Sequence, residues 1–244
     1  MQYRDLTDNI CVITGASSGI GEATARALVA EGAQVILVAR SADKIEKLAE
    51  ELGAKASAMP TDVGDAEAVA RLFERIKADY GAVDLMFNNA GVGYNDPFAE
   101  SKPEEWKKQI DANLYGVLNC TQAAIPLMKG REAPMISTVS SVGGRFGVPG
   151  WSVYCATKFA VVGFHDTLRK ELGGDGIRVS LIEPGAVYTN WGFNVSEEAM
   201  QERRDKVDAL HPEDIASSLV YAFAQPGHVN AQEILVMPTK QVSP

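Results

Sequence analysis

Tyr154 and Lys158 lie four residues apart in the segment Y-C-A-T-K, so a helix there would place both side chains on one face. A tyrosine hydroxyl with an ordinary pKa near ~10 exchanges protons poorly at pH 7. An ammonium group one turn away should stabilise the phenolate and lower the pKa of Tyr154, which would make it usable as a general acid or base. Taken alone, this short pattern of two common residues is better explained as a random pair on a solvated helix, so its meaning depends on the rest of the chain.

A hydroxyl group is expected beside this pair. The apolar run 134–139 indicates a buried strand, and it ends in Ser140 and Ser141. In open α/β sheets, ligands bind in the crevice outside the carboxyl ends of the strands, so a serine there would face the ligand. The strand end and the following helix could therefore present a hydroxyl, a phenol and an ammonium group to one small carbonyl.

A glycine-rich loop near residue 15 indicates a nucleotide site. The apolar run 10–14 is followed by G-A-S-S-G-I-G at 15–21 and by helical spacing over 22–31. Glycines let backbone N–H groups approach a pyrophosphate, which sits at the positive end of the helix. The spacing differs from G-x-G-x-x-G, and glycine loops also serve as plain turns. The strand before the loop and the helix after it favour the nucleotide interpretation.

Strands and helices alternate along the whole chain. We expect strands over 10–14, 34–39, 55–60, 83–88, 134–139, 178–183 and 232–237, and helices over 22–31, 43–52, 65–79, 101–129, 152–172, 197–208 and 212–223. Ser41 could cap the second helix, and Ser101 with Glu104 resembles a capping box. The alternation predicts one α/β domain over 1–244, a Rossmann-like doubly wound parallel sheet of about seven strands with helices on both faces.

The composition excludes several classes of partner. The 244 residues are 46% hydrophobic, enough for a full core, and their net charge of −9 argues against nucleic acid or an anionic membrane surface. No apolar run approaches the ~20 residues needed to span a bilayer, and we expect a cytoplasmic protein. Neither the three cysteines nor the three histidines have metal-like spacing, so no metal site or disulfide framework is expected; these are Cys11, Cys120, Cys155, His165, His211 and His228.

Together these motifs resemble the short-chain dehydrogenase/reductase family over nearly the whole chain. The matching segments are T-G-A-S-S-G-I-G at 14–21, N-N-A-G at 88–91, Asn113, Ser141, Y-C-A-T-K at 154–158 and P-G-A-V-Y-T at 184–189. Tyr154 follows Ser141 by 13 residues, the usual separation in the family. Each motif is short, but their order and spacing together are specific. The segment 233–241 resembles the branch that holds clavulanic-acid-type dehydrogenases and NADP-dependent 3-hydroxy-acid dehydrogenases.

The resemblance implies four catalytic roles. Ser141 would hold the substrate carbonyl oxygen, and Tyr154 would donate a proton to that oxygen as hydride arrives. Lys158 would lower the pKa of the tyrosine and hydrogen-bond the nicotinamide ribose. Asn113 would order a water that extends the proton path, although it could also be only a helix-bending polar residue. The physical chemistry agrees, because a developing alkoxide would be met by two hydroxyl donors.

The resemblance also implies a cofactor site. Asp62 and Val63 would bind adenine, and Val187 with Thr189 would hold the carboxamide. Asn89 would flank the adenine ribose, or could instead hold the central sheet together. The full set comprises Gly15, Ser17, Ser18, Gly19, Ile20, Gly21, Arg40, Ser41, Asp62, Val63, Asn89, Ala90, Gly91, Tyr154, Lys158, Pro184, Gly185, Val187 and Thr189.

The end of the second strand predicts NADP(H) as the cofactor. NAD enzymes of this fold carry an acidic residue there, which binds the ribose 2′-hydroxyl and would repel a 2′-phosphate. Here the position is Ala39, and no acid follows until Asp43. Arg40 could meet a 2′-phosphate with a bidentate guanidinium, and Ser41 could add a hydroxyl. The glycine loop itself lacks the lysine or arginine that many NADP-dependent members carry.

An apolar surface is expected around the reacting carbonyl, formed by Tyr94, Phe146, Val148, Trp151, Trp191 and Phe193. It favours a bulky, uncharged ketone or aldehyde reduced by NADPH, although each residue could belong to the core. An NADP-dependent 3-hydroxy-acid (serine-type) dehydrogenase is the alternative. Its carboxylate substrate would need a cation, and Arg203 and Arg204 are the nearby candidates. A non-catalytic nucleotide-binding protein is the remote alternative.

Two further expectations concern larger features. The segment 186–208 is too long for a bare connection, so we expect it to act as a lid. The helices 103–129 and 152–172 carry apolar residues beyond one core-facing stripe. We therefore expect a homo-oligomer, with a tetramer preferred to a dimer, because such helices pack across a two-fold axis in relatives.

Overall fold

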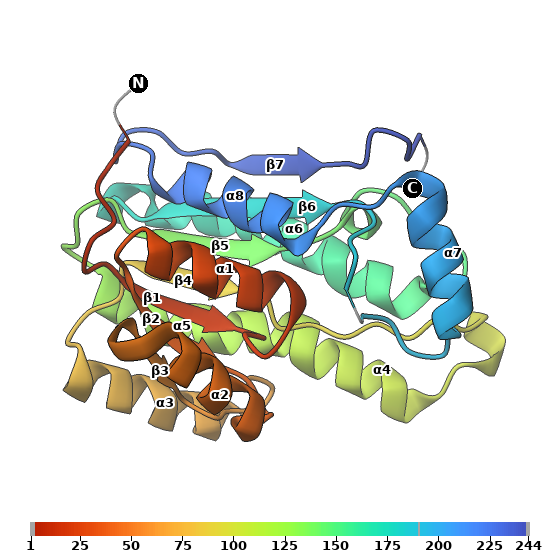
Figure 1. The fold of residues 1–244 in the computed structure, drawn as a ribbon, viewed down its shortest axis with the longest axis horizontal. Helices are drawn as coiled ribbons and strands as arrows, with labels where there is room; N and C mark the ends of the chain where they lie inside the picture. Colours follow the sequence, from red (N-terminus) through yellow and green to blue (C-terminus); the bar gives the residue numbers. More distant parts are fainter. Residues whose placement is uncertain (1–2, 190, 243–244) are drawn as a thin grey trace.

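A single parallel sheet forms the centre of the molecule (Figure 1). The structure is a computed structural model that describes residues 3–189 and 191–242, and of Arg203 only the backbone. The strands follow the order β3-β2-β1-β4-β5-β6-β7, which confirms the predicted doubly wound α/β fold. They are β1 (Ile10–Thr14), β2 (Gln34–Val38), β3 (Ala56–Ala58), β4 (Leu85–Asn88), β5 (Met135–Val139), β6 (Arg178–Pro184) and β7 (Glu233–Val236).

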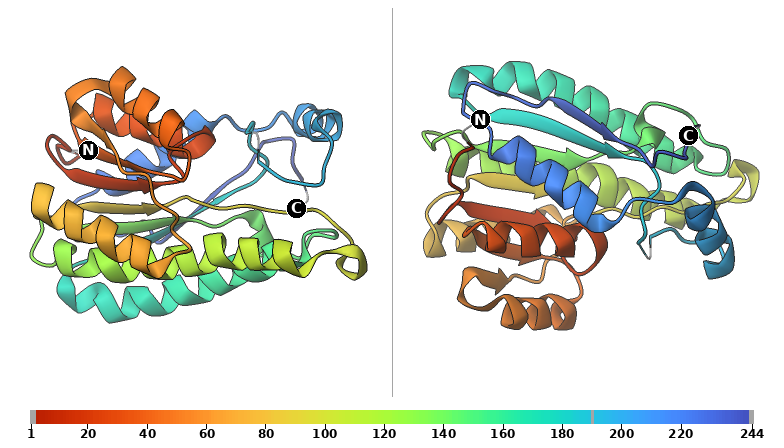
Figure 2. Two further views of the ribbon diagram at one scale, coloured as in Figure 1. Left: turned by 90° about the horizontal axis from the view of Figure 1, so that it is seen from below. Right: turned by 45° about the horizontal axis from the view of Figure 1, so that its top comes forward.

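Helices cover both faces of the sheet (Figure 2). One face carries α1 (Gly19–Ala30), α2 (Ala42–Leu52) and α8 (Pro212–Phe223). The other carries α3 (Ala66–Asp79), α4 (Pro103–Ile110), α5 (Gly116–Met128) and α6 (Ser152–Leu172). The helix α7 (Glu197–Val207) lies beyond the carboxyl ends of the strands (Figure 1). Short 3-10 turns span Gly53–Lys55, Phe98–Glu100, Val142–Gly144 and Gly173–Asp175.

The inner strands read largely as apolar runs because both of their faces are buried, whereas the edge strands β3 and β7 are only partly buried. In β1, Cys11 and Ile13 join the core beneath α1 and α8, whereas Val12 joins the core beneath α3 and α5. In β4, Phe87 and Met86 divide between the two cores in the same way. Side chains on successive residues point to opposite faces, so each strand supplies both layers.

The expected long helix over 101–129 is one helix with an irregular middle. Residues Asp111–Tyr115 form a π-helix between α4 and α5, in which the N–H of Gly116 reaches the carbonyl of Asp111. The predicted capping box is wrong, because α4 begins at Pro103 after Lys102. The Ser101 hydroxyl instead donates to the Phe98 carbonyl and accepts from Trp106 Nε1.

Other helix starts also differ from expectation. The helix α1 begins inside the glycine loop at Gly19, three residues before the predicted start. Ser41 precedes α2, but its side chain makes no capping hydrogen bond. Side-chain caps occur instead at α3, where Asp65 accepts from two backbone N–H groups, and at α7, where Ser196 accepts from Ala199 N.

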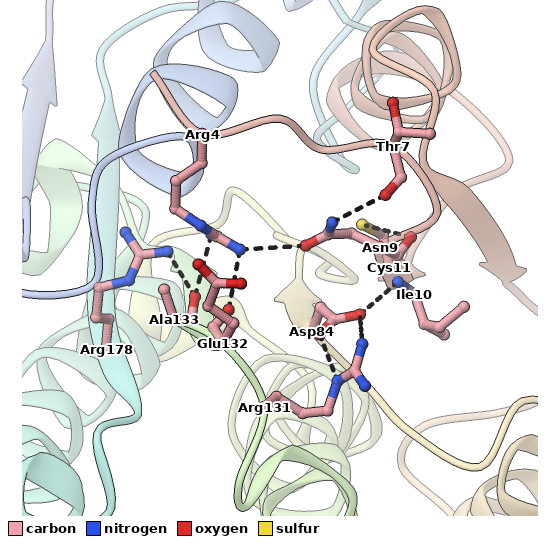
Figure 3. Close-up of polar contacts among 10 residues, drawn as sticks. All are labelled: Arg4, Thr7, Asn9, Ile10, Cys11, Asp84, Arg131, Glu132, Ala133 and Arg178. Atoms are coloured by element: carbon pink, nitrogen blue, oxygen red, sulfur yellow. Dashed lines mark hydrogen bonds and ion pairs between the residues drawn. The ribbon is translucent and has the colours of Figure 1, made fainter. Parts of the chain in front are cut away.

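A polar network closes the amino ends of the strands (Figure 3). The buried carboxylate of Asp84 accepts from Arg131 Nε at 2.7 Å and from Ile10 N at 2.8 Å. Arg178, buried at the start of β6, donates to the carbonyl oxygens of Ala133 and Phe223, each at 2.8 Å. Buried polar groups at this end are therefore largely paired, as stability requires.

Among the described residues, none of the helices combines the length and the apolar character that crossing a bilayer requires. The same part of the chain contains no cluster of three or more His, Cys, Asp or Glu side chains arranged to hold a metal ion.

Candidate active site

A cleft of about 380 Å³ opens at the carboxyl ends of the strands, where doubly wound sheets bind their ligands. Its volume lies within the usual range for sites that bind small molecules. The walls come from the glycine loop after β1, the ends of β2, β4, β5 and β6, the start of α6 and the segment that leads to α7.

The glycine loop leaves no room for side chains where the backbone must come close. Gly15 has φ +65°, and a Cβ there would lie 2.8 Å from Ala90 Cα. A Cβ at Gly21 would overlap with the carbonyl oxygen of Gly15. The loop therefore folds tightly onto the first turn of α1, whose free N–H groups give that end a positive field. Such a cradle fits a pyrophosphate.

Asn89 ties this loop to β4. Its Nδ2 donates to the carbonyls of Thr14 at 3.0 Å and Gly15 at 3.3 Å. The N–H groups of Asn89 and Ala90 both donate to Thr14 Oγ1. Asn89 lines the cleft, but its amide is occupied in holding β1 and β4 together, which matches the second of the two roles considered for it.

Ser141, Tyr154 and Lys158 lie along one wall of the cleft. Ser141 begins the turn after β5, and its Oγ accepts from Gly143 N at 3.0 Å. Tyr154 lies near the start of α6, with its ring 4.8 Å from that of Trp191. Lys158 lies one turn further on, buried, with Nζ 5.6 Å from the centre of the Tyr154 ring. The strand end and the helix thus bring the predicted hydroxyl, phenol and ammonium groups together.

The pKa values of Tyr154 and Lys158 differ from those expected from the sequence. Burial raises the pKa of Tyr154 well above its ordinary value, and the Ser141 hydroxyl opposes this shift. Burial also lowers the pKa of Lys158 to about 8. The Lys158 ammonium donates to the Val139 carbonyl at 2.7 Å instead of contacting the phenol oxygen. The expected lowering of the tyrosine pKa by Lys158 is therefore absent from this structure, and Tyr154 is protonated at neutral pH.

Asn113 belongs to the π-helix and is completely buried. Its Oδ1 accepts from Val92 N, and its Nδ2 donates to the Val92 carbonyl, both at 2.8 Å. Nδ2 also donates to Thr157 Oγ1 at 3.1 Å. Both hydrogens of the amide are used, so this side chain joins the loop after β4 to α6, and only a second lone pair of its oxygen is left to hold a water.

The other predicted residues mostly line the cleft. Of the cofactor set only Gly21 lies outside the lining. Arg40 is exposed at the mouth, beside Ala39 at the end of β2. In the predicted substrate wall, Val148, Trp151, Trp191 and Phe193 line the cleft, whereas Tyr94 and Phe146 do not. Tyr94 stacks on Phe193 at 4.9 Å, and Phe146 is 52% exposed in a loop.

The segment 186–208 forms the far wall. Trp191 stacks on Trp151 with ring centres 5.3 Å apart, and Arg204 of α7 also faces the cleft. The side chain of Arg203, the other predicted cation, lies outside the described part of the chain, as does Asn190.

Gln241 also lines the cleft, although the sequence analysis did not predict it. Its Oε1 accepts from Ala186 N at 2.8 Å and so fixes the loop after β6 from the last turn of the chain.

Comparison with known proteins places this cleft in context. Residues 9–200 match the family described as short chain dehydrogenase. The chain is 39% identical over 239 residues to glycine betaine reductase of Emericella nidulans, which covers 96% of this chain but only 19% of that protein. It is 36% identical over 242 residues to an uncharacterized oxidoreductase of Staphylococcus saprophyticus, covering 97% of this chain and 98% of the relative.

Solved structures of similar proteins contain nicotinamide cofactors. The closed form of a serine dehydrogenase complexed with NADP+ has a TM-score of 0.92 and 30% identity, and the match covers 96% of each chain. An alcohol dehydrogenase from Thermococcus sibiricus complexed with 5-hydroxy-NADP has a TM-score of 0.87 and 32% identity, covering 97% of this chain and 99% of that one.

The buried Lys158 should make stability depend on pH. Its pKa is about 8 in the folded protein and 10.5 as a reference for the unfolded chain. Between these values the unfolded chain binds more protons, so stability should rise with pH. Relative to Lys158→Met, the free energy of unfolding of the wild type should gain up to about 3 kcal/mol between pH ~8 and ~10.5. Urea unfolding of both proteins across this range measures the gain, and a constant difference would contradict desolvation of Lys158.

Proposed function

The chain belongs to the short-chain dehydrogenase family, and from this membership we propose that it is an NADPH-dependent oxidoreductase that reduces a ketone or aldehyde to an alcohol. One observation carries the proposal. Ser141, Tyr154 and Lys158 share one wall of a cleft that begins at the glycine loop. A cleft that only bound a nucleotide would not need these three groups, which argues against a non-catalytic binding protein.

The cradle at the start of α1 supports a dinucleotide. Gly15 and Gly21 let the loop pack closely against Ala90, Asn89 and its own backbone, and the free N–H groups of the first turn of α1 suit a pyrophosphate. Val187 and Thr189 also line the cleft, and the nicotinamide is expected beside them. When bound, the reduced nicotinamide supplies a hydride to the carbonyl carbon.

Tyr154 is the proposed proton donor. The phenol is protonated at neutral pH and so carries a proton that it could donate to a carbonyl oxygen. As the carbonyl carbon accepts the hydride, the Tyr154 hydroxyl gives its proton to the oxygen and the alcohol forms. Ser141 would hold the same oxygen through a second hydrogen bond and stabilise its developing negative charge. Lys158, held by the Val139 carbonyl, would supply positive charge behind the phenol.

The substrate is proposed to be bulky and apolar at the reacting end. Trp151 and Trp191 form a stacked pair beside Tyr154, and a flat or branched ketone could pack on them. A 3-hydroxy acid is the second candidate. It is favoured by the similarity of the whole chain to serine dehydrogenase and requires a cation in the cleft.

We propose that the segment 186–208 acts as a lid. Trp191 reaches the Tyr154 ring from this segment, so closing it would exclude water from the reacting carbonyl. Slower amide exchange over 186–208 with NADPH than without it would support the lid, and equal exchange would rule it out.

A homo-oligomer is proposed from the outer faces of two neighbouring helical elements. The exposed apolar side chains Ile110, Tyr115 and Phe159 lie on α4, the π-helix and α6, which pack side by side (Figure 2). Burying these side chains against a second copy would remove apolar surface from water. A tetramer is preferred to a dimer, and light scattering at micromolar concentration decides between them. A monomeric mass would refute both.

Replacing Tyr154 by phenylalanine should remove the proton donor and leave cofactor binding intact. Because general acids typically contribute ~10²–10⁴-fold, kcat should fall at least ~10²-fold. The Kd for NADPH, measured by nicotinamide fluorescence, should stay within about threefold. Tyr221→Phe is the matched control, since Tyr221 lies half exposed on α8, away from the cleft lining. A Tyr154→Phe enzyme that kept a tenth of wild-type kcat would refute the assignment.

The cofactor preference should depend on Ala39 and Arg40. A hydrogen bond to a charged group is worth ~1.5–3 kcal/mol, so wild type should prefer NADPH to NADH by roughly ten- to a hundredfold in kcat/KM. The double change Ala39→Asp with Arg40→Leu removes an attraction to the 2′-phosphate and adds a repulsion, so the preference should reverse. Arg71→Leu, which removes an exposed arginine of α3, should leave it unchanged. Equal efficiency of wild type with both cofactors would show that Arg40 has been assigned wrongly.

A further inference from the structure

Arg204 is a buried cation on the wall of the cleft. It lies in the last turn of α7, is only 7% exposed, and faces the same space as Thr189 and Trp191. Among the described residues, no carboxylate comes within ion-pair distance of its guanidinium. Its neighbour Asp205 instead accepts from the Tyr188 hydroxyl and from Gln201 Nε2. A buried charge without a counter-ion is costly, so its place here needs an explanation.

Backbone contacts satisfy only part of this guanidinium. Arg204 Nε donates to the Met200 carbonyl at 3.1 Å, and Nη1 donates to the Thr189 carbonyl at 2.8 Å. Tyr188 lies beside it, with the ring centre 5.9 Å from the guanidinium carbon. Nη2 makes no hydrogen bond to any described residue. Two of the five N–H donors of the group are therefore used by the protein.

Arg178 provides an internal comparison. It is also buried and also lacks a carboxylate partner among the residues that the structure describes. Its Nη atoms, however, donate to the carbonyls of Ala133, Ala222, Phe223 and Val229. It lies at the amino end of β6, away from the cleft. Where this protein buries an arginine for structure alone, it surrounds both Nη atoms with oxygen, whereas Arg204 keeps donors for the cleft.

Arg204 lies between the start of α1, where the cofactor is expected, and the aromatic wall, where the substrate is expected. The Thr189 methyl group lies 3.0 Å from where a Cβ on Gly19 would be, so the residue whose carbonyl holds Arg204 lies beside the start of α1. Met200, which accepts from its Nε, packs toward Gly192 and hence toward Trp151 of the aromatic wall. An anionic group could approach from either half.

We infer that Arg204 binds an oxyanion of a ligand in the cleft, either the carboxylate of a 3-oxo or 3-hydroxy acid or the pyrophosphate of the cofactor. Both present anionic oxygens to the free N–H groups, and a guanidinium fork binds such oxygens in pairs. The contact neutralises the buried charge and links ligand binding to the position of α7. This inference rests on the proposed function, because it assumes ligands of that enzyme.

The test compares wild type with Arg204→Met, Arg204→Lys and the control Lys206→Met. Lys206 is an exposed cation on the same helix, so its loss changes the charge of α7 outside the cleft. In the substrate arm, kcat/KM with NADPH is measured for a 3-oxo acid and for its methyl ester. The ratio of the two values cancels any general damage to α7, since both substrates need the same closed cleft. In the cofactor arm, the Kd for NADPH is measured without substrate.

Carboxylate binding predicts that the acid-to-ester ratio falls about ten- to a hundredfold in Arg204→Met, is partly restored in Arg204→Lys and is unchanged in Lys206→Met. Pyrophosphate binding predicts an unchanged ratio and a Kd for NADPH raised by about tenfold or more, again partly restored by lysine. Either pattern supports the inference. If neither quantity responds, or if lysine restores nothing, Arg204 only fastens α7 to the Thr189 loop and the inference is wrong.

Failure of the proposed function has a different signature. It would appear as a wild-type protein that oxidises no NADPH with either substrate. The inference is then tested by binding alone. The rise in Tm that NADPH or a 3-hydroxy acid produces is measured for wild type and for Arg204→Met, and the two rises are compared. A ligand that raises the Tm of wild type more than that of Arg204→Met supports the oxyanion contact. Equal rises overturn it.

Discussion

The hydroxyl group of Thr14 joins the carboxyl ends of β1 and β4, and the cleft depends on this junction. It donates to the Phe87 carbonyl and accepts from the N–H groups of Asn89 and Ala90. In the strand order, the chain leaves β1 toward β2 and leaves β4 toward β5, in opposite directions. A crevice must open where the connections diverge, and Thr14 with Asn89 fixes its width. The glycine loop, the turn after β5 and the loop after β6 are all positioned relative to that fixed edge.

The two ends of the sheet use polar groups in opposite ways. At the amino ends, Asp84 pairs with Arg131 and accepts from Ile10 N, and Arg178 donates to the carbonyl of Ala133 (Figure 3). At the carboxyl ends, the buried Arg204 keeps N–H donors that no described residue accepts, and the exposed Arg40 lines the mouth of the cleft. Buried polar groups are normally paired, so a buried guanidinium with free donors beside a cleft marks a place where a ligand could complete the hydrogen bonding.

The sequence was sufficient to predict the elements whose pattern is periodic and whose faces are both buried. The sheet, α6 and α8 were expected with almost the observed bounds, and the residues around Ser141 and Tyr154 do meet in one cleft. The meeting of these residues could be predicted from the order of the short motifs, because few folds place a glycine loop, a serine and a tyrosine at those intervals.

Features that depend on packing could not be predicted in this way. The π-helix around Asn113 was missed because one extra residue in a turn leaves the apolar pattern almost unchanged. The pKa of Tyr154 was predicted in the wrong direction, since sequence spacing counts the nearby charge but not the burial of both groups. Pro103 set the start of α4 and made Ser101 unavailable as a cap. Gln241 lies 55 residues from its partner Ala186, and no local signal connects them.

The contact between Gln241 and Ala186 also shows how unevenly the walls of the cleft are distributed along the chain. The wall at the glycine loop is built from β1, β4 and the segments that follow them, all within residues 10–91. The loop after β6 is instead fixed by a side chain 55 residues further along the chain. Removing residues 239–242 would take no side chain from either hydrophobic core, yet it would release the N–H group of Ala186 and with it one wall of the cleft.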